Sequence, residues 1–413
     1  MLLATQDLID KLNDGRVSAG ATLVINSRQP FAFDALPPLD GLAHYRFLDK
    51  RPVPNVVVER DIGAPSPCIR QVADLLRVEM TNPEVRRRYR LRRCTMKLLA
   101  GVSGSGKTLT VEAIHRQMYE IMSEVTGVPM DQLPPRVFRL CMSKVLSMWL
   151  GESDKNLERF FDEVEQLARE PFLAPDGRKI ILPVLTVLEE IDGLARARGH
   201  EPIYDRILTT ALQRLDPNRE SLNDLLIVFL GTTNEPQQVD TAFMRRIGGT
   251  VEQFGRLRRK AFMAVLQKHL QERPVAANNG TPPDDLRRKM ASDLTAWLFS
   301  PNGADHGVVE LTYAGATTPV IKYRRDLLTG AMVERAVHEA SEAAAQAEHG
   351  GAKDPGLTLD LLVREFEKQI TGIVDQLREQ NAAHYLDLPD GVRVATLRRI
   401  PQPSRQPIEY QRT

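Results

Sequence analysis

Hydrophobic residues recur at two different spacings along the chain, and the change between them predicts its organisation. Between residues 56 and 255, short apolar runs rich in branched side chains alternate with amphipathic segments. Such runs are typical of buried parallel strands, and the alternation is typical of a parallel sheet with helices on both faces. The strand runs are VFRLCM, ILPVLTVL and LLIVFLG. We therefore expect an α/β domain over 56–255.

Helical spacing dominates after residue 255. Apolar side chains recur there at steps of three and four residues, as in helices with one buried face. The expected helices cover 257–271, 285–299, 326–347 and 357–379. Two strand-like runs around a glycine turn interrupt them and predict a hairpin over 308–323. This pattern predicts a second, mostly helical domain over 256–380.

The two ends of the chain carry weaker patterns. Residues 22–35 alternate like a strand pair around a turn, and Pro37, Pro38, Pro52 and Pro54 then interrupt the chain. We expect a short β remnant and linker over 1–55. Residues 381–413 predict a short strand and a flexible tail.

Composition narrows the function classes. The chain has 413 residues, with 55 Lys plus Arg against 54 Asp plus Glu, so no global positive field favours nucleic acid or an anionic membrane. Its three cysteines have none of the paired spacings of disulfide frameworks or metal sites. No apolar run reaches the length of a signal peptide or a membrane span. We expect a cytoplasmic protein without membrane partners.

The segment 101–108 carries the strongest chemical signal. It reads GVSGSGKT, follows a strand-like MKLLA and precedes a helix, as a loop that binds nucleotide phosphates does. Its glycines let backbone N–H groups approach a polyphosphate, while the lysine reaches the outer phosphates and the threonine hydroxyl ligates Mg²⁺. The residues expected to bind ATP are Gly101, Ser103, Gly104, Ser105, Gly106, Lys107, Thr108 and Leu109.

Two later strands end in polar residues that complete such a site. Glu189 stands where an aspartate usually orients Mg²⁺ through water, and Glu190 stands where a general base activates the attacking water. Asn234 follows the next strand and would help to position that water. An acidic helix start after a strand is the alternative interpretation of the two glutamates.

Two further groups of residues have positions that suggest a role. Arg245 and Arg246 follow Asn234 and would stabilise transition-state charge on a neighbouring subunit's nucleotide, although arginine pairs are also common on solvated faces. Trp149 and Leu150 lie in an expected loop where a large side chain would grip a threaded polymer. A core tryptophan at a helix end is the alternative.

Taken together, these motifs resemble an AAA ATPase module over about residues 56–345. VERDIG, WLGESDKNLERFF and GTTNEPQQVDTAFMRR are similar to three of the family's characteristic segments, and LLTGAMVERAVHEASEAA is similar to its lid helix. The resemblance implies a P-loop AAA+ parallel sheet followed by a helical lid. It also implies a ring, usually a hexamer, in which Trp149 belongs to the central-pore loop.

A narrower resemblance is to the bacterial proteasome-associated ring ATPases. VVELTYAGATTPVIKYRRDLLTGAM, PGLTLDLLVREF and RVATLRRI are similar to that subgroup's lid and tail, and ATLVINSRQPFAFDALP is similar to the end of its oligonucleotide-binding-fold barrel. We expect no counterpart of the subgroup's N-terminal coiled coil or of most of the barrel. The chain ends in Tyr410-Gln-Arg-Thr413 where the subgroup ends in Gln-Tyr-Leu, which argues against docking to a proteasome-like protease.

The leading hypothesis is an ATP-hydrolysing hexamer that unfolds and translocates a polypeptide substrate. A nucleotide-binding assembly or regulatory protein with slow turnover is the alternative, because Glu189 replaces the usual aspartate and Gly248 or Gly249 occupies the second arginine-finger position. A nucleic-acid remodeller is the third hypothesis, based on six arginines in segment 86–93. Charge runs of that kind are usually solvated faces, so nucleic acid is the partner we expect least.

Overall fold

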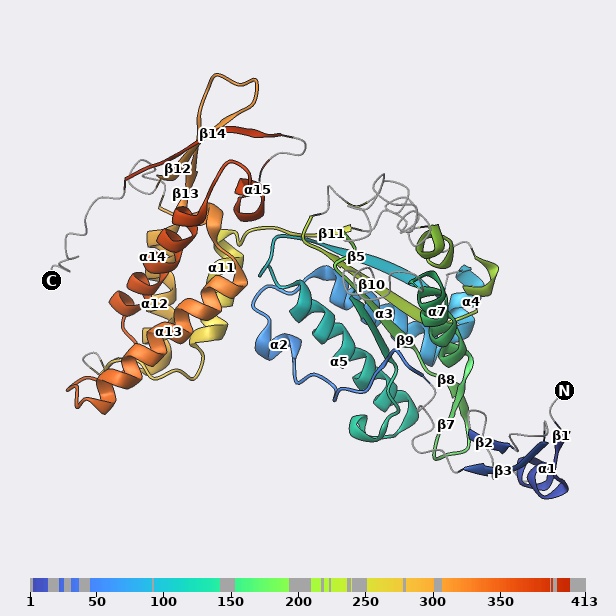
Figure 1. Ribbon diagram of the computed structural model, residues 1–413. Helices are drawn as coiled ribbons and strands as arrows, with labels where there is room; N and C mark the ends of the chain where they lie inside the picture. The colour runs from blue at the N-terminus through green and yellow to red at the C-terminus, as the bar shows by residue number, and fades with distance from the viewer. Residues whose placement is uncertain are drawn as a thin grey trace.

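The computed structural model describes most of the chain. The described residues are 3–13, 22–25, 31–36, 45–90, 93–141, 153–192, 209–216, 219–222, 224–235, 239, 251–277, 280–300, 307–386, 388 and 392–401. Figure 1 shows an α/β body with a helical domain beside it and a small β unit near the N-terminus.

A six-stranded sheet forms the centre of the α/β domain. Its strand order is β11-β5-β10-β9-β6-β4, and all neighbours pair in parallel except β4, which runs antiparallel to β6. The strands are β4 (Leu48–Asp49), β5 (Thr95–Gly101), β6 (Val137–Cys141), β9 (Val184–Glu189), β10 (Ile227–Thr233) and β11 (Val251–Phe254). The sheet confirms the predicted α/β class and adds an edge strand, β4, from the segment before residue 56.

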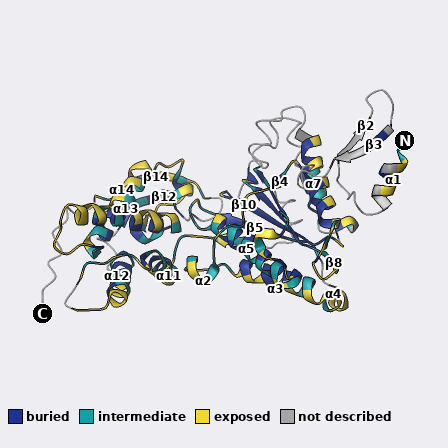
Figure 2. Cartoon of the chain, turned by 90° about the horizontal axis from the view of Figure 1, so that it is seen from below, coloured by how far each residue is buried: buried dark blue, intermediate teal, exposed yellow. Residues whose placement is uncertain are grey.

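Helices cover both faces of this sheet, as buried parallel strands require. On one face, α3 (Pro67–Thr81) and α5 (Lys107–Thr126) share an apolar core with the strands; on the other, α7 (Ser153–Arg169) does so. Figure 2 shows the strands and the inner sides of these helices as buried. The remaining elements of this region are α2 (Val58–Asp61), α4 (Pro83–Tyr89), η1 (Met130–Gln132), β7 (Pro171–Leu173), β8 (Lys179–Ile181) and η2 (Glu220–Leu222).

One expected strand is divided in two. The run ILPVLTVL was predicted as a single strand, but Ile181 ends β8, which pairs with β7, and Val184 begins β9 in the main sheet. Pro183 lies between them and has no N–H to give to a sheet, which explains the break. The buried strand is therefore shorter than predicted and still ends at Glu189.

The second domain packs four helices around a separate apolar core. The helices are α11 (Arg259–Leu270), α12 (Pro283–Leu298), α13 (Gly330–His349) and α14 (Leu359–Gln376), with η5 (Arg324–Leu327) and α15 (Ala382–Tyr385) between or after them. The predicted hairpin consists of β12 (Gly307–Tyr313) and β13 (Val320–Tyr323). The late strand β14 (Val394–Arg399) pairs with the other edge of β12 and makes a three-stranded sheet.

A third sheet lies near the N-terminus. The expected strand pair is present as β2 (Thr22–Ile25) and β3 (Phe31–Leu36), which run antiparallel. The sheet also contains β1 (Leu3–Ala4), parallel to β3, with α1 (Gln6–Asn13) packed on it, and neither element was expected from the sequence pattern.

Candidate functional site

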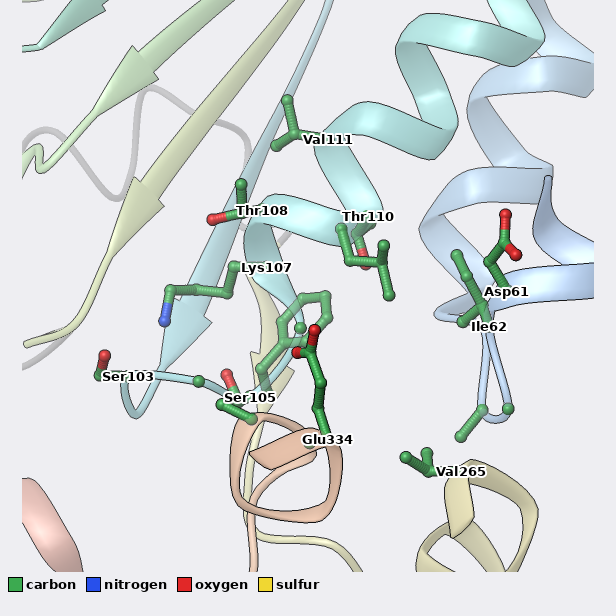
Figure 3. Close-up of a pocket in the computed structure, with 18 of the residues that line it drawn as sticks. Asp61, Ile62, Ser103, Ser105, Lys107, Thr108, Thr110, Val111, Val265 and Glu334 are labelled. Carbon is green, nitrogen blue, oxygen red and sulfur yellow. The ribbon is translucent and has the colours of Figure 1, made fainter. Parts of the chain in front are cut away.

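A cavity of about 780 Å³ opens between the α/β domain and the helical domain. Its walls come from segment 60–64, the loop before α5 and the start of α5, the middle of β6, the ends of β9 and β10, and helices α11 and α13. Figure 3 shows Lys107, Thr108 and Ser105 on one side and Asp61, Ile62 and Val265 on the other. All the residues expected to bind ATP line this cavity except Gly101, which lies at the base of the loop.

The loop over 101–108, called the phosphate loop below, has a backbone that needs glycine. Gly101, Gly104 and Gly106 have φ values of 148°, 73° and 101°, a region that residues with a side chain rarely adopt. The loop leads directly into α5, whose 20 residues begin at Lys107. Unsatisfied N–H groups and the helix dipole therefore concentrate positive potential at the cavity.

The phosphate loop also contacts the helical domain. The amide N–H of Ala331 in α13 donates to the carbonyl of Gly104 at 3.1 Å. A Cβ atom at Gly104 would lie 2.8 Å from the Cβ of Ala331. The start of α13 thus rests against the loop with no room for a side chain at this position.

Lys107 is buried and points along the phosphate loop. Its Nζ donates to the carbonyls of Gly101 at 2.7 Å and Val102 at 2.9 Å. Burial lowers the pKa of Lys107 to about 8, although Asp192 nearby favours the charged form. The ammonium group is held where an anion entering the loop would replace these neutral acceptors.

The donor set of the phosphate loop fits a polyphosphate. The Ser105 hydroxyl oxygen is buried with no hydrogen-bond partner among the described residues, and a Cβ at Gly106 would meet nothing within 4 Å. Backbone N–H groups, one ammonium and the Thr108 hydroxyl thus face one open space without a bulky obstacle. ATP with Mg²⁺ is the ligand that this arrangement suits.

Glu189 ends β9 in an ion-pair network that the sequence does not reveal. Its Oε1 lies 3.1 Å from Nη1 of Arg139 in β6. The Nε of Arg139 lies 3.0 Å from Oδ2 of Asp49 in β4, and Arg51 contacts the same oxygen at 2.8 Å. Burial opposes ionisation of Asp49, but its hydrogen bonds from Arg51 outweigh that effect and hold its pKa below the ordinary value.

Glu190 has the left-handed backbone conformation, with φ of 55°. Its N–H donates to Oγ1 of Thr232 at 3.4 Å, and its carboxylate accepts from Sγ of Cys141 at 3.5 Å. A non-glycine residue with positive φ at the end of a strand is a strained feature that tends to occur at functional sites. The side chain lines the same cavity as Lys107 and Asn234.

The end of β10 is fixed by side-chain hydrogen bonds. Oγ1 of Thr233 donates to Oδ1 of Asp192 at 2.8 Å and accepts from the N–H of Glu235 at 3.0 Å. These bonds connect β10 to the segment after β9. They also fix the position of Asn234, which lies between Thr233 and Glu235 in the chain. The expected neighbours Glu189, Glu190 and Asn234 therefore lie on one wall of the cavity.

The part of the cavity wall that the helical domain supplies contains residues that sequence reasoning missed. His269 and Glu334 reach the cavity from α11 and α13, and burial lowers the pKa of His269 below its ordinary value. Lys268 donates to the carbonyl of Glu59. A Cβ at Gly63 would lie 2.5 Å from the backbone nitrogen of Val265, so segment 60–64 and α11 are in close contact. Val265, Lys268 and His269 belong to no local motif, whereas Gly63 and Glu334 lie in two of the segments that resemble the AAA family but were not assigned to the site.

Some expected site residues lie outside the described part of the chain. Trp149 and Leu150 fall within 142–152, and Arg245 and Arg246 fall within 240–250. Their roles in a pore and in a neighbouring subunit's site stay predictions.

The arginine-rich segment is partly engaged in ion pairs. Arg86 lies 2.8 Å and Arg93 lies 2.5 Å from the carboxylate of Glu79, which is only 5% exposed. Arg87 pairs with Glu84 at 2.6 Å on the surface. Arg86 and Arg93 thus form a largely buried ion-pair cluster beside α4 rather than the solvated face expected of a charge run, whereas Arg87 lies on the surface.

Two other classes of site receive no support from the described residues. Within those ranges, no three His, Cys, Asp or Glu side chains are grouped so as to hold a metal ion by themselves. No helix in the same ranges is long and apolar enough to cross a membrane.

The known proteins that the chain matches are ATPases, in agreement with a cavity suited to a polyphosphate. Residues 97–253 match the family model "ATPase family associated with various cellular activities (AAA)". Proteins named "Proteasome-associated ATPase" from Mycobacterium avium (strain 104) and Mycobacterium tuberculosis (strain ATCC 25177 / H37Ra) are each 26% identical to the chain, over 98% and 100% of it. The alignments cover 63% and 65% of those relatives, so the chain spans less than two thirds of their length. The predicted resemblance to AAA ATPases, and to the proteasome-associated group, is confirmed.

Proposed function

We propose that this AAA-type chain, a distant relative of the proteasome-associated ATPases, binds ATP with Mg²⁺ in the cavity between its two domains and hydrolyses it. The observation that supports this most is the convergence of the phosphate loop, Glu190 and Asn234 on one cavity. Each comes from a different element of the sheet, and together they supply phosphate binding, a base and a positioning amide.

In the proposed reaction, water attacks the terminal phosphorus atom, and the bond between that atom and the bridging oxygen of ADP breaks. Lys107 and the N–H groups of the phosphate loop hold the phosphates, and Thr108 with Glu189 holds the Mg²⁺ that arrives with the nucleotide. Glu190 accepts the proton that the attacking water loses, and Asn234 orients that water. When bound there, Mg²⁺ would supply positive charge to offset the charge that develops on the phosphate oxygens.

The helical domain is proposed to respond to the bound nucleotide. The contact between Ala331 and Gly104 connects α13 to the phosphate loop through the backbone alone. A ligand that changes the conformation of this loop should therefore change the position of α13. This would couple the two domains through a hinge-type motion. In the proposed ring, Arg245 or Arg246 completes a neighbour's site, and Trp149 with Leu150 moves a polypeptide through the pore.

A second candidate function is a nucleotide-binding assembly or regulatory protein with slow turnover. The observation that favours it is the ion pair between Arg139 and Glu189, since this arginine occupies a carboxylate that the reaction needs for its metal. Both functions use the same cavity and differ in the rate of hydrolysis.

One set of assays separates these proposals. ATP turnover is measured with and without an unfolded model protein, together with the mass of the assembly in the presence of ATP. Stimulated turnover in a ring supports the translocase, whereas ATP binding without turnover supports the regulatory protein. The variant Glu190→Gln is expected to bind ATP and lose hydrolysis, while Lys107→Met is expected to lose binding. Unchanged turnover in Glu190→Gln would refute the assignment of the base.

A further inference from the structure

We propose that Arg139 is a positioning residue that sets how much Mg²⁺ the nucleotide site requires. Arg139 pairs with the Glu189 carboxylate, and Asp49 on the edge strand holds Arg139 partly away from that pairing. This inference rests on the proposed function, because it assumes that Glu189 faces the metal that accompanies a nucleotide.

The pairing arises from the register of three strands. β6 lies between β9 and β4, with Cys141 opposite Glu189 and Val137 opposite Asp49. Arg139 is the middle residue of β6, so its side chain can reach both neighbouring strands. Its Nη1 lies 3.1 Å from Glu189 and its Nε lies 3.0 Å from Asp49.

Burial makes this contact more than a surface ion pair. The side chains of Asp49 and Arg139 are only 10% and 14% exposed, whereas that of Glu189 is 39% exposed and borders the cavity. The charge of the arginine is therefore shared between Asp49 on the inner side and Glu189 at the cavity. A partly buried pair is less screened by water and salt than an exposed one.

A metal ion and Arg139 compete for the carboxylate of Glu189. Oε1 of the carboxylate accepts from the guanidinium, so a Mg²⁺ ion whose water shell met the same carboxylate would lie close to Arg139, and the two cations would repel each other. Binding of the metal thus requires the loss or weakening of one charge-assisted hydrogen bond. We infer that Arg139 raises the Mg²⁺ concentration at which nucleotide binds.

Asp49 has the opposite effect: it lowers the Mg²⁺ concentration at which nucleotide binds. It neutralises part of the charge of Arg139 and holds one of its nitrogens. Removal of the Asp49 charge would leave Glu189 as the one carboxylate paired with Arg139 among the described residues, so the pair at the cavity would strengthen. Replacement of Arg139 and replacement of Asp49 should therefore shift the Mg²⁺ requirement in opposite directions, which general destabilisation would not do.

The test is a Mg²⁺ titration of the binding of a fluorescent ADP analogue to the full chain. We expect Arg139→Gln to lower the Mg²⁺ midpoint by roughly two- to fivefold, the range for one partly exposed ion pair. Asp49→Asn is expected to raise the midpoint by about twofold on the same scale. Arg139→Lys, which keeps the charge, should have a midpoint near that of the unaltered protein.

Two controls sharpen the result. Asp176→Asn removes an acid–arginine pair of 2.6 Å in the turn between β7 and β8, away from the cavity lining, and should leave the midpoint unchanged. In Glu189→Gln, the added change Asp49→Asn should no longer shift the midpoint, because the carboxylate that Arg139 shares with the metal is gone. This second comparison remains available if Arg139→Gln fails to fold.

The inference is overturned if Arg139→Gln and Asp49→Asn both leave the midpoint where it was or move it the same way. Weaker binding of Arg139→Gln at saturating Mg²⁺ would also overturn it, because that result would mean that Arg139 touches the nucleotide directly. Failure of the unaltered protein to bind the analogue at any Mg²⁺ concentration would instead refute the proposed function.

Discussion

Gly104 contacts Ala331, and replacing Gly104 should cost free energy through two separable contributions, backbone strain and steric overlap. Gly104→Ala places a side chain on a residue with φ of 73°, which costs about 1–2 kcal/mol, and its Cβ would lie 2.8 Å from the Cβ of Ala331. Overpacking of this kind typically costs a further 1–3 kcal/mol, or about 2–5 kcal/mol in total. The substitution should therefore separate α13 from the phosphate loop or distort the loop.

The two contributions can be distinguished with matched variants. Gly106→Ala has φ of 101° but no atom within 4 Å of its Cβ, so it carries only the backbone contribution. The double variant Gly104→Ala/Ala331→Gly removes the steric contribution and should regain about 1–3 kcal/mol, less the roughly 1 kcal/mol cost of glycine in a helix.

The assay is amide hydrogen exchange at the start of α13, where the N–H of Ala331 donates to Gly104, combined with nucleotide affinity. Gly104→Ala should speed exchange there and weaken binding, and the double variant should recover both. If the double variant exchanges as fast as Gly104→Ala, the steric argument is wrong.

Three further predictions follow from buried groups. Because burial lowers the pKa of Lys107 to about 8, the free protein loses this charge as pH rises, so ATP affinity should fall roughly tenfold from pH 7 to pH 9. The same lowered pKa makes the nucleotide-free fold gain stability between pH 8 and pH 10, and an affinity that does not change with pH would contradict it. Glu79→Gln removes a buried carboxylate shared by two arginines and should lower the free energy of unfolding in urea by roughly 3 kcal/mol, against about 0.5 kcal/mol or less for the exposed Glu84→Gln. Burial raises the pKa of Cys68 to about 11, so an alkylating reagent at pH 7.5 should modify the partly exposed Cys141 first in mass spectra, and early modification of Cys68 would show that the core is open there.

The parts of the site that lie in one stretch of chain could be predicted from the sequence. The phosphate loop is a contiguous motif with fixed neighbours, so Lys107 and Thr108 were identified together with the strand and helix that flank them. Glu189 and Asn234 were identified because each follows a buried apolar run, and carboxyl ends of parallel strands meet at one edge of a sheet.

The network around Arg139 could not be predicted in this way. Asp49, Arg139 and Glu189 are far apart in sequence, and only the register of β4, β6 and β9 brings them together. β4 has two residues, too few for any periodicity to reveal. His269 and Glu334 were missed for a related reason, because they reach the cavity only when the second domain packs against the first.

The pairing of β14 with β12 bears on how the protein folds during its synthesis. The main sheet has all its strands once Phe254 has left the ribosome, so the first domain can form while the rest is still being made. The second domain cannot complete its sheet until residues 394–399 emerge, and until then β12 has an unpaired edge that other chains could join. We expect nascent chains stopped between β13 and β14 to aggregate, and the interval before release to be the stage at which this protein depends most on chaperones.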